Sequence, residues 1–210
     1  MVIIIIASIC NADGSKGAYF MVGMDMPVIS ELNTMLTDNE YPELKNQLIS
    51  YGFGVHVPVK ERIMLGFEWH WLYGKEVTNN DESVKSSLST NYWFFNLGYY
   101  VVSVANLNVY PFIGVGNGEM TLTMVDVVVP NFDEILDEPS GVTRLSTGGF
   151  LLNPSLGVDY TFRNLIIGIR GGYIFDPFTG DWKMEDADVS GGPDEGITGP
   201  FARIILGFGG

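Results

Sequence analysis

The stretch IMLGFEWHWLY, residues 63–73, divides into two faces when it is read as a β-strand, because successive side chains point to opposite sides. One face is bulky and apolar or aromatic: Ile63, Leu65, Phe67, Trp69, Trp71 and Tyr73. The other face contains a glycine and polar groups: Met64, Gly66, Glu68, His70 and Leu72. The second face fits a narrow barrel interior better than the first. The stretch therefore predicts a strand whose large face is solvated by lipid.

Other parts of the chain alternate in the same way, and most of these stretches are long enough for a tilted bilayer crossing. We expect eight strands, over residues 17–26, 47–59, 62–75, 90–104, 107–124, 149–161, 165–176 and 199–209. A short helical turn is tolerable only within residues 28–48. Pro111 fits poorly inside a closed sheet, so it should require a bulge or a distorted ladder.

The connections between these strands alternate strictly in length. The short ones are residues 59–62, 105–107 and 162–164, and the long ones are 27–46, 76–89, 125–148 and 177–198. This order is typical of an up-and-down barrel with short turns at one rim and long loops at the other. The predicted fold class is all-β, an eight-stranded antiparallel up-and-down transmembrane β-barrel.

The composition excludes several classes of protein. Hydrophobic residues make up 46 % of the 210, which is too many for a disordered chain. The net charge of −14 would repel a phosphate backbone, so we expect no nucleic-acid partner. With Cys10 as the single cysteine and only His56 and His70 as histidines, we predict no metal site and no cofactor.

A closed barrel leaves no unpaired backbone edge in hydrocarbon, and eight strands leave room only for side chains inside. Glycines on the inner face are then required by crowding. Aromatic side chains on the outer face are candidates for girdles at the two membrane interfaces. They are Tyr51, Trp69, Trp71, Tyr73, Trp93 and Tyr99. The alternative is that they form the core of a water-soluble barrel.

Three charged residues of the predicted inner face lie at a similar height above the short turns: Glu68, Arg170 and Arg203. Because buried charges must be paired, we predict that Glu68 pairs with both arginines and that His70 lies close above. This lumen charge cluster has two interpretations. It is a structural plug that satisfies the barrel interior, or it is a gate across a narrow pore.

The first residues have a separate interpretation. The apolar run Val2 to Ile9, followed by Cys10 to Ala12, resembles the end of a secretory signal, so residues 1–12 are assigned to a signal-peptide remnant. Two alternatives remain open, an ordinary buried strand and a lipid anchor at Cys10. Residues 17–210 are assigned to the barrel domain.

The alternating strands carry loose glycine motifs: Gly-Phe-Gly at 52–54, Pro-Phe-Ile-Gly-Val-Gly at 111–116 and Arg-Ile-Ile-Leu-Gly-Phe-Gly at 203–209. With these motifs, residues 17–210 resemble the small outer-membrane barrel family of OmpA/OmpX type. The resemblance concerns architecture and not activity. It implies a location in the bacterial outer membrane, with short periplasmic turns and long extracellular loops.

We expect a non-catalytic, monomeric outer-membrane protein with a structural or surface-display role. No catalytic residue is predicted, because no serine lies next to His70 in sequence and a nucleophile would need such a base within reach. The alternatives are a narrow gated channel and a soluble, lipocalin-like ligand-binding barrel. Membrane lipid is the expected partner. Acidic loops, such as Asp126 to Glu138 and Asp181 to Glu195, offer contact with lipopolysaccharide through divalent cations. The sequence identifies no extracellular partner.

Overall fold

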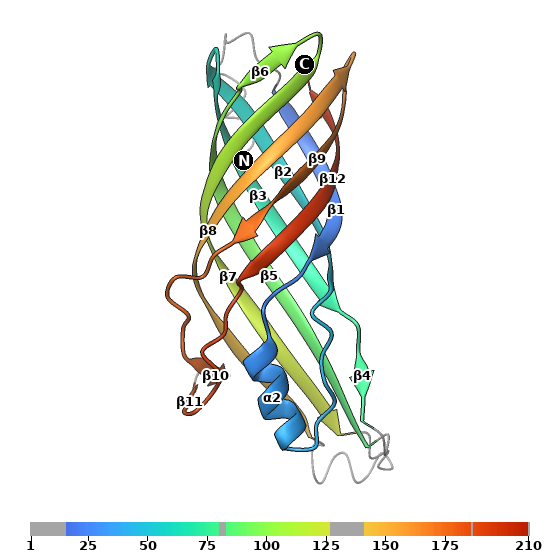
Figure 1. Ribbon diagram of the computed structural model, residues 1–210, viewed down its shortest axis with the longest axis vertical. Coiled ribbons are helices and arrows are strands. Elements are labelled where there is room, and N and C mark those ends of the chain that lie inside the picture. The colour runs from blue at the N-terminus through green and yellow to red at the C-terminus, as the bar shows by residue number, and fades with distance from the viewer. Residues whose placement is uncertain (1–15, 80–82, 127–140, 186, 210) are drawn as a thin grey trace.

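The computed structural model describes residues 16–79, 83–126, 141–185 and 187–209. Eight of its strands form a closed antiparallel barrel, in which each strand pairs with the next along the chain and β1 pairs with β12 (Figure 1). They are β1 (Gly17–Asp25), β2 (Leu48–Lys60), β3 (Ile63–Gly74), β5 (Val84–Tyr99), β7 (Leu107–Asp126), β8 (Val142–Phe162), β9 (Leu165–Ile174) and β12 (Gly199–Gly209). The predicted eight-stranded, up-and-down architecture is confirmed.

The connections fall at the two rims as the sequence predicts. The long connections contain the short strands β4 (Val77–Thr78), β10 (Trp182–Met184) and β11 (Ala187–Val189), together with helix α2 (Ser30–Asp38). Figure 1 shows these elements gathered at one end of the barrel. At the other end, β6 (Val102–Val104) forms a hairpin with β7. Its tip residues Ala105 and Asn106 have φ angles of 50° and 71°, as a two-residue type I′ turn requires.

The pairing register fixes the dimensions of the barrel. Following directly opposed residues around the wall from Val109 of β7 leads back to Glu119 of the same strand, a shift of ten residues. The path runs through Val158, Ile169, Ile204, Val22, Tyr51, Trp71 and Asn91. With strand spacings of about 3.3 Å and 4.8 Å, eight strands and this shift give a tilt of about 40° and a radius of about 8 Å. Such a barrel has room inside for side chains only.

The outer surface of the barrel carries a continuous apolar belt. Ile49, Ile169 and Ile204 are each about 60 % exposed, whereas Glu68 and Arg170 of the inner face are 1 % and 3 % exposed. At a tilt of about 40°, the stretch Ile63 to Tyr73 rises about 25 Å along the axis, which is the height of the apolar band of outer-membrane barrels. The predicted orientation is confirmed. A lipocalin-like barrel does not fit, because its apolar face would point inward.

Above this belt, toward the long loops, the two faces exchange character. Within the belt, one outward row of three opposed residues is apolar and the next row, facing inward, is small or polar. These rows are Phe95–Val115–Leu152 and Asn96–Gly114–Asn153. Nearer the long loops, the outward row is polar and the inward row is apolar. These rows are Ser89–Thr121–Ser146 and Leu88–Leu122–Leu145. The barrel therefore has a membrane part whose interior combines charged and polar groups and glycines with apolar side chains, and an outer part whose interior is mainly apolar.

This exchange explains where the predicted strands were too short. β5 begins at Val84 and not at residue 90, and β8 begins at Val142 and not at residue 149. Both strands continue above the membrane with the pattern of a water-exposed sheet, so alternation with a lipid-facing apolar face predicts only their membrane part. Residues 102–104, predicted as the end of the fourth strand, form the separate strand β6.

The bulge expected at Pro111 is not found. β7 pairs with β8 in unbroken register through this residue, and its pairing with β5 ends one residue away, at Phe112. A register shift lies instead between Pro58 and Lys60. The proposed signal remnant, residues 1–12, and most of the acidic stretch 126–138 lie outside the described residues. Within the described part of the chain, no helix combines the length and hydropathy that a membrane-spanning helix needs.

Arginine substitutions on the outer face test the boundary of the belt. Ile204 is the central residue of β12, so Ile204→Arg should lower the free energy of unfolding in lipid vesicles by about 2–4 kcal/mol. Thr121→Arg, outward-facing but above the belt, should change it by no more than about 0.5 kcal/mol. Urea titration of the vesicle-inserted barrel measures both values. Equal costs at the two positions would contradict the assignment of the belt.

Candidate functional site

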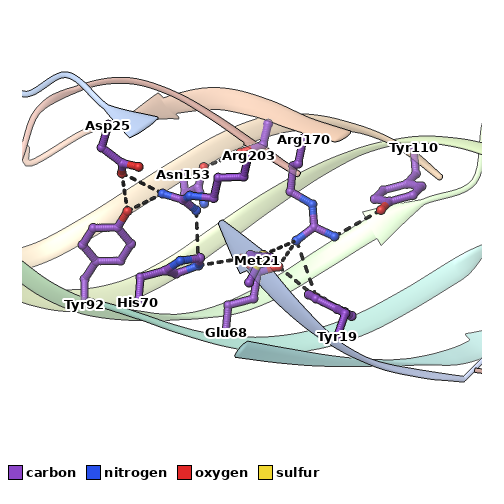
Figure 2. Close-up of polar contacts among 11 residues, drawn as sticks. Tyr19, Met21, Asp25, Glu68, His70, Tyr92, Tyr110, Asn153, Arg170 and Arg203 are labelled. Atoms are coloured by element: carbon purple, nitrogen blue, oxygen red, sulfur yellow. Dashed lines mark hydrogen bonds and ion pairs between the residues drawn. The ribbon is translucent and has the colours of Figure 1, made fainter. Parts of the chain in front are cut away.

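The lumen charge cluster is built on two arginines that oppose each other directly on neighbouring strands. Arg170 of β9 and Arg203 of β12 are register partners, and both point into the lumen. Like charges in this position repel, so each guanidinium needs its own carboxylate. Figure 2 shows the two side chains diverging, Arg170 toward Glu68 and Arg203 toward Asp25.

Arg170 is held by a carboxylate and two tyrosines. Its Nη1 forms an ion pair with Glu68 Oε1, and its Nη2 donates to the Tyr110 hydroxyl at 3.1 Å. The Tyr19 hydroxyl also donates to Glu68 Oε1, at 2.9 Å. The guanidinium carbon lies 4.5 Å from the centre of the Phe112 ring, within range of a cation–π interaction. The charge is therefore neutralised and enclosed at the same time.

Arg203 has a similar arrangement nearer the long loops. Its Nη2 donates to Asp25 Oδ2 at 2.7 Å, and the Tyr92 hydroxyl donates to the same carboxylate oxygen. The guanidinium carbon lies 3.9 Å from the centre of the Phe201 ring. The sequence pattern predicted that Arg203 pairs with Glu68, but in the structure its carboxylate partner is Asp25.

His70 connects the two halves of the cluster. Its Nε2 lies 3.2 Å from Glu68 Oε2 and 3.2 Å from Arg203 Nη1 (Figure 2). A protonated Nε2 donates to the carboxylate, whereas an unprotonated one accepts from the guanidinium. Two arginines and two carboxylates already sum to zero charge, so a neutral imidazole leaves the cluster balanced.

Residue burial indicates that this level of the lumen is filled. His70, Tyr92 and Tyr110 are fully buried, Glu68 is 1 % exposed and Arg203 is 3 % exposed. Water therefore has almost no access to these side chains. Among the described residues, the side chains of the cluster are packed together at this height of the lumen.

An apolar cap covers the cluster on the long-loop side. Inward side chains of the extended strands pack there against α2 and against Trp182 and Ile197 of the last long connection. The members from the barrel wall include Leu48, Leu72, Leu88, Met120, Leu122, Leu151 and Ile174. On α2, Leu32 and Leu36 supply the buried side, one turn of helix apart. The cap excludes water from the charges below it.

Helix α2 is fixed in the cap by hydrogen bonds from other segments. Ile29 precedes the helix and offers no side-chain cap, but Glu195 accepts from the backbone N–H groups of Glu31 and Leu32 at 2.8 and 2.9 Å. The Asn33 side chain donates to the Leu44 carbonyl oxygen at 3.0 Å and accepts from the Leu44 N–H at 2.9 Å. These contacts join α2 to the last long connection and to the chain that leads into β2.

In that last connection, the N–H of Asp176 donates to Thr198 Oγ1 at 3.1 Å. Burial raises the pKa of the Asp176 carboxyl group, and hydrogen bonds from the backbone of Ile197 and Phe178 act against this shift. A Cβ at Gly196 would lie 2.2 Å from Asp176 Oδ2, so the close approach of the two chain segments depends on a glycine there.

The six aromatic residues proposed for the girdles lie on the outer face at two heights. Tyr51, Trp71 and Tyr73 form one contiguous group, with the Tyr51 and Tyr73 rings stacked at 5.5 Å between centroids. Trp69 contacts Trp71 at 5.9 Å, and Trp93 lies on β5 two residues below the outward-facing Asn91. Tyr99 ends β5 at the short-turn rim, away from the other five aromatic residues. The girdle role of these residues remains a prediction.

Metal binding and nucleophilic catalysis each need a particular arrangement of side chains. Over the described ranges, no group of three or more His, Cys, Asp or Glu side chains is arranged to hold a metal ion. Glu68 and His70 are adjacent as a base and its partner would be, but the Ser155 hydroxyl donates to Asn153 Oδ1 and not to His70. Asp25, Tyr19, Tyr92 and Tyr110 are cluster members that the sequence analysis missed.

Comparisons with known proteins agree with this architecture. No protein-family model matches the sequence, and no curated protein matches it. Among solved structures, Ail, the attachment invasion locus protein of Yersinia pestis, has a TM-score of 0.51 at 9 % identity, over 93 % of this chain and 97 % of that chain. A major outer membrane protein from Thermus thermophilus has a TM-score of 0.53 at 8 % identity, over 93 % and 98 %.

A second structure of Ail, in complex with the heparin analogue sucrose octasulfate, has a TM-score of 0.51 at 8 % identity, over 93 % and 95 %. Identities this low show a shared fold and carry no information on activity. The chain has the fold of the small barrels of the bacterial outer membrane.

Removing the carboxylate of the cluster should be costly, because it leaves a buried guanidinium without its counter-ion. We expect Glu68→Gln to lower the free energy of unfolding by about 3–5 kcal/mol, measured by urea titration in vesicles. Adding Arg170→Met should restore most of this loss. The control is Glu76→Gln, which removes an exposed pair with Lys85 at 3.1 Å and should cost less than about 1 kcal/mol. A cost at Glu68 no larger than the control would contradict buried ion pairing.

The contact between Glu195 and α2 gives a second prediction. Glu195→Ala removes the acceptor of two helix N–H groups and should destabilise the first turn by about 1 kcal/mol. Hydrogen exchange at Glu31 and Leu32 should then be faster by roughly fivefold, while strands of the membrane part exchange as before. Asp194→Ala serves as the control, since no hydrogen bond or ion pair joins Asp194 to α2 in the described structure. Unchanged exchange in Glu195→Ala would show that α2 is held by its apolar side alone.

Proposed function

We propose that this chain is a non-catalytic, structural barrel of the outer membrane that displays its capped long-loop end at the cell surface. The observation that carries the proposal is the balanced and water-excluded charge cluster across the lumen. A transport path would need mobile water at this height, and a catalyst would need a reactive group open to substrate. The geometry instead favours a rigid membrane anchor.

The cap is the part of the molecule suited to contact with other molecules. It projects beyond the apolar belt, and its outward rows include hydroxyl and amide side chains, such as Ser89, Asn91 and Thr121, beside charged ones such as Glu119 and Arg144. Membrane lipid is the partner of the belt, and we propose that the barrel works as a monomer. Contact of the acidic loops with lipopolysaccharide through divalent cations belongs to the same proposal.

The ligand of Ail is not carried over to this chain. Sucrose octasulfate is a polyanion, whereas this chain has a net charge of −14. Repulsion between like charges disfavours a sulfated saccharide at this surface. We therefore expect a partner of the cap to carry no net negative charge, or to be bridged to the acidic loops by divalent cations.

A narrow gated channel is the second candidate, supported by the position of His70 between Glu68 and Arg203. Opening would require at least one arginine to leave its carboxylate inside the barrel, which costs several kcal/mol. The structural role needs no such rearrangement and is therefore preferred.

Conductance in planar lipid bilayers tests the choice between the two functions. The purified wild-type barrel should give no discrete current steps, because its lumen is filled at the level of the cluster. Its insertion is verified separately by the heat-dependent shift of the folded band in gel electrophoresis. Current steps that are present in the wild type and vanish in Glu68→Ala would establish the channel and overturn the structural proposal.

A further inference from the structure

Beside α2, a groove of about 1080 Å³ opens at the rim of the barrel. β1 and β2 are paired up to Asp25 and Leu48, and beyond this pair the two chain segments separate. One segment continues along β12 through Met26 and Val28, and the other returns from α2. Figure 1 shows the first segment leading from β1 into α2 and the second passing beside the helix toward β2. The double hydrogen bond between Asn33 and Leu44 holds the returning segment against α2, so the groove is preformed.

The side of the groove nearest the membrane is continuous with the lipid-facing belt. Met26 and Val28, which line it, are 36 % and 45 % exposed. Directly below them, the opposed pair Met24 and Ile49 is 41 % and 62 % exposed. An acyl chain of the surrounding leaflet can therefore run along the outside of β1 and β2 and reach the groove without crossing polar surface.

The opposite side of the groove is polar and nearly balanced in charge. α2 contributes the hydroxyl groups of Ser30, Thr34 and Thr37, and the returning segment contributes the amides of Asn46 and Gln47. The hydroxyl protons of Thr34 and Thr37 are donated to backbone carbonyl oxygens, so these oxygens face a ligand as acceptors. The amides supply donors as well as acceptors.

Among the described residues, one cation lines the groove, Lys45, and its charge is balanced by the carboxylate of Glu43. Phosphate-binding sites concentrate positive charge, which this groove does not. A saccharide headgroup donates and accepts hydrogen bonds through several hydroxyl groups and carries no phosphate, so it fits this wall better than a charged or zwitterionic phospholipid headgroup. The apolar wall adds the requirement for an acyl chain.

We propose that this groove binds a saccharide-headed lipid of the membrane leaflet that surrounds the long-loop rim. The acyl chain lies along Met24 and Ile49, and the sugar hydroxyl groups contact Thr34 and Gln47. The inference rests on the proposed function in so far as that function places the barrel in the outer membrane. It adds a specific lipid to the general contact between belt and bilayer.

Lipid retention tests the proposal. The barrel is refolded into vesicles of phosphatidylcholine, phosphatidylglycerol and diglucosyl diacylglycerol in equal amounts with the same acyl chains, extracted in mild detergent and examined by native mass spectrometry. The wild type should retain one diglucosyl diacylglycerol in preference to either phospholipid, by roughly tenfold, as expected from a few hydrogen bonds gained at the headgroup.

Two variants on the same helix separate the groove from the rest of α2. Thr34→Trp fills the groove and should abolish the preference. Met35→Trp places the same side chain on a neighbouring exposed position outside the groove and should retain it. Gln47→Ala, on the other wall, should reduce the preference without adding bulk. Folding of each variant is verified by its heat-dependent gel shift.

Equal retention of the three lipids by the wild type, or a preference that persists in Thr34→Trp, would overturn the proposal. Displacement of the glycolipid by millimolar maltose would also overturn it, because the saccharide alone would then suffice and the apolar wall would have no part. None of these outcomes affects the bilayer conductance of the barrel, so failure of this inference is distinguishable from failure of the proposed function.

Discussion

Every backbone N–H and C=O group inside a bilayer must find its partner within the protein, and this requirement determines the rest of the structure. It forces the sheet to close through the pairing of β1 with β12, and closure with eight strands limits the radius to about 8 Å. A lumen this narrow accepts glycines and interlocking side chains but no bulky apolar face. The charges inside are tolerated only because each arginine has a carboxylate and an aromatic ring beside it.

The barrel contacts lipid along one part of its length and water along the other, and the outward side chains are apolar in the first part and polar in the second. In the belt, the apolar residues point outward to lipid, and the charged residues are buried and paired inside. Above Trp93, the same strands turn apolar side chains inward and present serine, threonine and asparagine to water. A single sheet thus serves as the wall of a membrane barrel and as the shell of a small water-exposed core. α2 and the last long connection complete that core.

The period-two pattern was sufficient to predict the number of strands, their order and their orientation, because lipid imposes a strong contrast between the two faces. It also brought Glu68, His70, Arg170 and Arg203 into one lumen. The pattern could not predict the partner of Arg203. Asp25 is the last residue of β1 and follows the outward-facing Phe20, Val22 and Met24, so the pattern does predict that it faces inward. Which carboxylate meets which arginine, however, depends on the shear of the barrel and the length of the side chains. The extended starts of β5 and β8 were missed because their pattern reverses above the membrane.

The cluster also links the two ends of the chain. Arg203 and Asp25 are separated by 178 residues, and they belong to the two strands whose pairing closes the barrel. Before β1 and β12 pair, Arg203 and Asp25 each lack their counter-ion, and burying either charge alone in hydrocarbon is strongly unfavourable. Desolvation of these two charges is therefore coupled to the joining of β1 and β12, so correct closure of the sheet and a dry lumen depend on each other.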